Sequence, residues 1–147
     1  MLIELLGRIE EEPVLELLSC AVFPDPEAIA RTVQLYKTDE AMELLGLEKD
    51  GALLGIAGFQ TDPNNRLRLQ HIAVHPEYRG QGYGRGLLLE LIALKQPAAI
   101  VAETDEEAVD FYRNVGFVVT SLGEKYPGVE RFHCIYEAEP AQEADDL

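Results

Sequence analysis

Cysteine is nearly absent from this sequence, and its scarcity excludes two classes of small protein. Only Cys20 and Cys134 occur among 147 residues, and they lie far apart. They have neither the CxxC spacing of a metal site nor enough partners for a disulfide framework. We therefore expect a protein of a reducing compartment and predict no metal centre.

Long apolar runs are also missing. No stretch is long enough to cross a bilayer, and the first residues, MLIELLGRIEEEP, lack the basic start and the long apolar core of a signal peptide. We expect a cytoplasmic protein that makes no contact with a membrane.

Basic residues are scarce as well, with 12 Lys and Arg against 27 Asp and Glu and a formal net charge of −15. Nucleic-acid binding depends on contacts from Lys and Arg to phosphates, so we predict no nucleic-acid partner. Solubility is the simpler explanation of the acidic excess, and attraction of cationic substrates is the alternative. We expect a single domain over residues 1–138, followed by an acidic C-terminal tail at 139–147.

The apolar pattern predicts a mixed α/β (α+β) fold without repeats or linkers. Asp25 and Pro26 are typical of the N-cap and first position of a helix. Asp50-Gly51 between two apolar runs indicates a β-hairpin. The expected strands cover 2–7, the two arms of 41–60, 66–74, 98–103, 117–122 and 131–138, and the expected helices cover 11–22, 25–39, a segment ending at Lys95, and 105–115.

A run of alternating glycines, Gly80 to Gly86, opens what is otherwise a strong helix. Glycine costs roughly 1 kcal/mol against alanine inside a helix, so its use here needs a reason. The start of a helix presents unpaired N–H groups and partial positive charge, and glycine lets phosphate oxygens approach them. Arg79 and Arg85 could add charge-assisted hydrogen bonds. The pattern predicts an anion site, and a flexible turn with solvated arginines is the alternative.

Arginines concentrate around this run: within twenty residues whose only acid is Glu77 lie Arg66, Arg68, Arg79 and Arg85. The phosphate-binding pattern GxxxxGK[ST] is absent because the chain has no Gly-Lys pair, and GxGxxG also fails. The pattern [Q/R]xxGx[G/A] is met by Arg79, Gly82 and Gly84.

Two segments in the same order resemble one protein family. IAVHPEYRGQGYGRGLL strongly resembles the acyl-CoA-binding segment of the GNAT superfamily of N-acetyltransferases. EEAVDFYRNVGF is similar to that family's helix-plus-strand motif, with its tyrosine at Tyr112 and its Gly-Phe pair at Gly116-Phe117. The resemblance covers roughly residues 40–138. It implies a central mixed, mostly antiparallel sheet of about six to seven strands, flanked by about four helices.

The resemblance also implies a site for acetyl-CoA as the acyl donor. Strand 69–74 would splay from its parallel neighbour 98–103, and the CoA arm would enter the gap. Backbone groups of Ile72, Ala73 and Val74 would pair with pantetheine and polarise the thioester carbonyl. Tyr112 would protonate the leaving thiolate. The pyrophosphate would be held by the backbone N–H groups of the glycine run, with Arg79 beside them: Gly80, Gln81, Gly82, Tyr83, Gly84 and Arg85.

The implied activity is transfer of an acetyl group to a primary amine of a small molecule or peptide by direct attack. Two positions depart from the family. Arg68 stands where many members carry a glutamate that acts as a general base, and Asp105 stands where an asparagine often contacts CoA. The general base stays open, with His71 and Glu103 as candidates by location only.

Several alternatives also stay open. A non-catalytic acyl-CoA-binding module, a partner-binding subunit and a purely structural Tyr112 each fit part of the pattern. The acceptor amine, the acyl chain length and a homodimer are not readable from one sequence.

Overall fold

The computed structural model describes residues 2–22 and 25–138. Contacts divide the chain into two compact units, one of Met1–Gln60 with Leu69–Gln96 and one of Thr61–Arg68 with Pro97–Leu147. A single domain over 1–138 stays a prediction, and the acidic tail at 139–147 lies outside the described residues. Within the described part, no helix has the length and apolar character needed to cross a membrane.

Seven strands are hydrogen-bonded in the order β1-β2-β3-β4-β5-β7-β6. The pairs β1–β2, β2–β3, β5–β7 and β6–β7 are antiparallel, and β4–β5 is parallel. The mixed, mostly antiparallel sheet is therefore confirmed, while the predicted splaying of β4 from β5 stays a prediction. The strands are β1 (Leu2–Glu4), β2 (Glu43–Lys49), β3 (Ala52–Thr61), β4 (Arg66–Val74), β5 (Ala99–Asp105), β6 (Val118–Tyr126) and β7 (Val129–Glu137).

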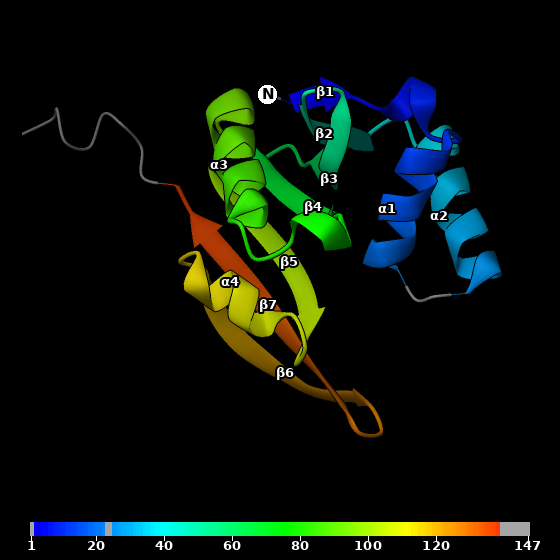
Figure 1. The fold of residues 1–147 in the computed structure, drawn as a ribbon. Helices are drawn as coiled ribbons and strands as arrows, with labels where there is room; N and C mark the ends of the chain where they lie inside the picture. The colour runs from blue at the N-terminus through cyan, green and yellow to red at the C-terminus, as the bar shows by residue number, and fades with distance from the viewer. Residues whose placement is uncertain (1, 23–24, 139–147) are drawn as a thin grey trace, which may run out of the picture. The chain divides into compact units, whose positions relative to one another are not determined.

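Among the described residues, the first unit contains three α-helices: α1 (Glu12–Ala21), α2 (Pro26–Thr38) and α3 (Tyr83–Lys95). Figure 1 shows α1 and α2 on one side of strands β1–β3 and α3 on the other. Helices α1 and α3 each bury an apolar stripe, and α2 buries Tyr36. The stripes are Val14, Leu17 and Leu18 on α1 and Leu87, Leu88 and Leu91 on α3.

Local sequence signals fix the ends of these elements. The Asp25 carboxylate accepts a hydrogen bond from the Glu27 N–H at 3.1 Å, as predicted for the N-cap of α2. Asp50 and Gly51 have φ of 52° and 81°, the pair of left-handed residues that a two-residue hairpin needs.

The second unit differs from the sequence prediction in two places. Helix α4 (Val109–Asn114) begins four residues later than expected, because the Asp105 carboxylate accepts hydrogen bonds from the N–H groups of Glu107 and Ala108 and holds them in a turn. Strands β6 and β7 also continue further toward each other and meet at Pro127-Gly128. In Figure 1, α4 lies beside this hairpin, which it contacts.

Candidate functional site

The glycine run begins after a short turn, Pro76–Tyr78, that follows β4. Gly80 and Gly82 have φ of 78° and 86°, a backbone conformation that strains any other L-residue. Gly82 is the N-cap of α3, which starts at Tyr83. A Cβ added at Gly80, Gly82 or Gly86 would meet nothing within 4 Å. The start of α3 therefore has open space around three of its glycines.

Arg79 joins the end of β4 to this loop. Its Nε donates a hydrogen bond to the carbonyl of Val74 at 3.0 Å, and the rest of the side chain is exposed. Arg85 is also exposed and lies in the first turn of α3. Both arginines predicted for the anion site thus carry their charge at the surface of the unit that contains the glycines.

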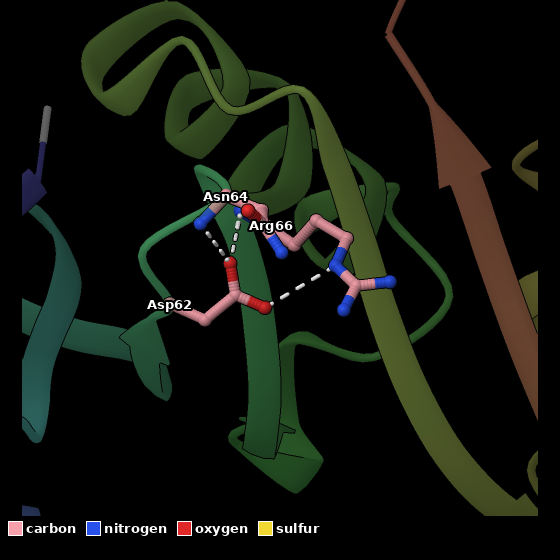
Figure 2. A network of polar contacts seen from close by, with 3 residues as sticks. All are labelled: Asp62, Asn64 and Arg66. Atoms are coloured by element: carbon pink, nitrogen blue, oxygen red, sulfur yellow. Dashed lines mark hydrogen bonds and ion pairs between the residues drawn. The ribbon is translucent and has the colours of Figure 1, made fainter.

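Arg66, by contrast, is engaged within its own loop (Figure 2). The Asp62 carboxylate accepts hydrogen bonds from the N–H groups of Asn64 and Arg66 at 2.9 and 3.0 Å, and from Arg66 Nε at 3.2 Å. The backbone hydrogen bond from Arg66 is the largest cause that holds the pKa of Asp62 below its ordinary value. Arg66 therefore stabilises the connection between β3 and β4. Its partner, Asp62, was not evident from the sequence.

The contacts of β4 show how its backbone is oriented near the three residues predicted to pair with pantetheine. A Cβ on Gly55 of β3 would lie 2.8 Å from the Ala73 oxygen, so the Ala73 carbonyl faces β3. The His75 N–H donates to the Leu54 carbonyl at 2.8 Å on the same side. Because strand residues direct their backbone groups to alternate sides, Ile72 and Val74 face the opposite edge. The Ala73 carbonyl thus lies on the β3 side of the strand, and the pairing of Ile72, Ala73 and Val74 with pantetheine stays a prediction.

Tyr112 is fixed by the end of α4. The Gly116 N–H donates to the Arg113 carbonyl at 3.1 Å and the Phe117 N–H to the Tyr112 carbonyl at 3.0 Å. With φ of 102° at Gly116, these two bonds form a Schellman motif, in which the residue after the glycine packs on the helix. The Phe117 and Tyr112 rings have centroids 5.2 Å apart. The Gly-Phe pair therefore sets the position of Tyr112.

The hydroxyl of Tyr112 reaches solvent although the residue is only 5% exposed. The oxygen has no hydrogen-bond partner among the described residues. Every fully buried side-chain oxygen in these residues has a partner, so the hydroxyl of Tyr112 must be accessible to solvent. Burial, with a smaller contribution from Cys134, raises the pKa of Tyr112. The side chain is thus a protonated phenol with a free O–H, which is what a proton donor requires.

Glu103 is a poor candidate for a base. Its carboxylate lies 3.1 Å from Arg131 Nε and 3.3 Å from Lys125 Nζ. Burial alone would raise the pKa of Glu103, but the hydrogen bonds from Arg131 and Lys125 outweigh it and hold the pKa below the ordinary value. We interpret Glu103 as a structural ion-pair residue of β5, β6 and β7.

The remaining positions of interest are placed as follows. Nδ1 of His71 lies 2.6 Å from the hydroxyl of Tyr36, and burial lowers the pKa of His71. Arg68 is exposed on β4, and Asp105 is occupied with the turn before α4. Within residues 2–22 and 25–138, no group of three or more His, Cys, Asp and Glu side chains could hold a metal ion.

Comparisons with known proteins bear on the family and the fold of the chain. The model of the acetyltransferase (GNAT) family matches residues 8–117. The N-alpha-acetyltransferase RimI of Mycobacterium tuberculosis is 34% identical over 88 residues, which cover 56% of this chain and 56% of the relative. The chain spans between 24% and 56% of the length of the first curated relatives that it matches.

Two solved structures share the fold. A GNAT-family protein of Desulfovibrio desulfuricans superposes with a TM-score of 0.79 at 20% identity, over 93% of this chain and 98% of its own. A Bacillus anthracis protein named as a streptothricin acetyltransferase, solved with acetyl coenzyme A, gives 0.60 at 18% identity, over 69% and 65% of the two chains. The family match spans most of the sequence and includes the glycine run, Tyr112 and the Gly-Phe pair, so this chain belongs to the GNAT family of acetyltransferases.

Proposed function

We propose that this protein is an N-acetyltransferase that moves an acetyl group from acetyl-CoA to a primary amine. The observation that carries the proposal is the start of α3, where the left-handed Gly80 and Gly82 have open space around them and two exposed arginines lie close by in the sequence. Membership in the GNAT family supports an acyltransferase in general. Acetyl-CoA as donor is supported by the B. anthracis neighbour that binds it.

In this proposal the donor follows one unit of the chain. The pyrophosphate accepts hydrogen bonds from the N–H groups of Gly80–Arg85, where a helix start favours anions. Arg79 and Arg85 add charge-assisted hydrogen bonds. The pantetheine arm and thioester then pair with the backbone of Val74 and Ile72 on the side of β4 that faces away from β3, where the Val74 carbonyl already accepts the hydrogen bond from Arg79.

The chemistry requires no metal. A neutral amine attacks the thioester carbonyl, and strand N–H groups stabilise the oxyanion that forms. When the C–S bond breaks, Tyr112 gives its proton to the departing thiolate, and the nitrogen loses a proton to solvent or a base. The free, protonated hydroxyl of Tyr112 supports its role as the acid.

A non-catalytic acyl-CoA-binding module is the second candidate. Arg68 favours this candidate, because it is an exposed arginine on β4 where many family members carry a glutamate that acts as the general base. An amine that arrives already neutral needs no strong base, and for this reason we prefer the enzyme.

A matched pair of glycine variants tests the donor site. Gly82→Ala and Gly51→Ala both place a side chain at a left-handed position with φ of 86° and 81° and open space around it. Each should therefore cost similar stability from backbone strain. In a thermal-shift titration, acetyl-CoA should raise the melting temperature of the wild type and Gly51→Ala but not of Gly82→Ala. Equal shifts in all three proteins would place the donor elsewhere.

A further inference from the structure

The pair Tyr36 and His71 is built into the interior of the first unit. Tyr36, near the end of α2, is 4% exposed, and its hydroxyl oxygen lies 2.6 Å from Nδ1 of His71 on β4. Gly58 on β3 leaves room for that hydroxyl, since a Cβ there would lie only 1.6 Å from the oxygen. Three separate elements therefore cooperate to hold one hydrogen bond.

The environment of the pair favours one tautomer of His71. A buried hydroxyl needs an acceptor for its proton, and Nδ1 is the only one found for Tyr36 among the described residues. Neutral imidazole accepts at Nδ1 only when its proton is on Nε2. Burial lowers the pKa of His71, which favours this neutral form at pH 7. Nε2 of His71 is thus an N–H donor. It has no lone pair with which it could accept a proton.

This N–H group reaches solvent, and His71 is adjacent in sequence to the proposed acyl site. Nε2 has no partner among the described residues. Every fully buried side-chain nitrogen in these residues has a partner, so Nε2 must be accessible to solvent. The proposed path of the donor runs from the glycine loop along Val74 to Ile72, and His71 is the next residue. One residue of a strand advances roughly 3.3 Å, so His71 follows directly on the position of the thioester.

We propose that His71 donates a hydrogen bond from Nε2 to an oxygen of the acceptor, so that the acceptor is an amine with a nearby carbonyl or carboxylate, as in a peptide N-terminus or an amino acid. A polyamine carries no such oxygen. His71 is then a specificity residue, and Tyr36 is a positioning residue that selects its tautomer. This inference rests on the proposed acetyltransferase function.

Two matched amines measure the effect on specificity. Glycinamide and ethylamine share the N–C–C chain, but only glycinamide carries a carbonyl oxygen. We would measure kcat/KM for both in the wild type, His71→Gln and His71→Leu. His71→Leu, which cannot donate, should reduce the preference for glycinamide over ethylamine by roughly 2- to 12-fold, the worth of one hydrogen bond. His71→Gln keeps an N–H donor and should retain most of it.

A further variant controls for misfolding of His71→Leu, and an NMR experiment tests the tautomer of His71 without relying on activity. His71→Leu leaves the Tyr36 hydroxyl without an acceptor, so the double variant Tyr36→Phe/His71→Leu, which removes both partners, should fold and show the same reduced preference. Long-range proton–nitrogen NMR on the wild type at pH 7.5 should show the proton of His71 on Nε2, and Tyr36→Phe should give a mixture of tautomers.

Each result separates the inference from the proposed function. An unchanged preference in both leucine variants, or a wild-type His71 that is protonated at Nδ1, would overturn the inference while acetyl transfer stands. If the wild type turns over no amine, the proposed function fails first, and the role of His71 toward an acceptor fails with it.

Discussion

Nε of Arg79 donates a hydrogen bond to the Val74 carbonyl at 3.0 Å, which ties the glycine loop to the end of β4. Val74 is one of the two residues whose backbone faces away from β3. The same arginine therefore orders the loop and presents the rest of its guanidinium, with its positive charge, beside the helix start. A substitution of Arg79 therefore tests both the order of the loop and the binding of the anion.

Replacing Arg79 should weaken acetyl-CoA binding. Arg79→Ala loses a charge-assisted hydrogen bond to the ligand, worth roughly 1.5–3 kcal/mol, together with the tie to Val74. Arg79→Lys keeps the charge but loses the Nε bond and should fall in between. Isothermal titration measures the three affinities, with the exposed Arg31→Ala on α2 as a charge-matched control. Affinity that is equal in Arg79→Ala and Arg31→Ala would reduce Arg79 to a loop residue.

Tyr112→Phe should separate catalysis from stability. The Tyr112 hydroxyl has no hydrogen-bond partner among the described residues, so its loss should change the melting temperature little. If the hydroxyl protonates the leaving thiolate, kcat should fall by roughly 10²- to 10⁴-fold. Tyr136→Phe, on the neighbouring strand β7, serves as the control and should keep wild-type turnover. Wild-type kcat in Tyr112→Phe would remove Tyr112 as the acid.

Glu103→Gln tests whether Glu103 is a base. Its carboxylate is committed to Arg131 and Lys125 in partly exposed ion pairs, which contribute at most about 1 kcal/mol. We expect a slightly lower melting temperature, with kcat and the acidic limb of its pH profile unchanged. A large loss of kcat, or an acidic limb that moves, would return Glu103 to the list of bases.

His71 should make stability depend on pH. Burial lowers the pKa of His71 in the folded protein from the ordinary 6.5, so the unfolded chain takes up this proton at a higher pH. The contribution of neutral His71 is complete above about pH 6.5 and is lost as the pH falls toward the lower folded pKa. Denaturant unfolding at a series of pH values should show a shallower decline below that point for His71→Gln than for the wild type. Identical slopes would mean that His71 is not shielded as the structure describes.

Sequence reasoning succeeds where a local signal determines the structure. The N-cap at Asp25, the hairpin at Asp50-Gly51 and the glycines before α3 each need only neighbouring residues for their explanation. The family motifs also place Tyr112 and its Gly-Phe pair correctly on a helix end.

It falls short where a distant partner decides. Tyr36 and His71 are separated by 35 residues, and no pattern in either segment announces their hydrogen bond. The two cations that hold Glu103 come from β6 and β7, and the carbonyl of Ala73 is turned toward β3 by the pairing of the strands. The late start of α4 is a local effect: the predicted helix 105–115 includes Asp105, whose carboxylate instead holds Glu107 and Ala108 in a turn before the helix.

The most direct test of the account is the fate of the acetyl group. Purified wild-type protein and Tyr112→Phe would be incubated with acetyl-CoA and a panel of peptides, amino acids and polyamines, and the amines analysed by mass spectrometry. The account predicts that the wild type adds one acetyl group to an amine and releases one CoA for each, and that Tyr112→Phe does so far more slowly. A wild-type protein that binds acetyl-CoA but acetylates no amine above the uncatalysed rate would contradict it and identify a non-catalytic acyl-CoA-binding module.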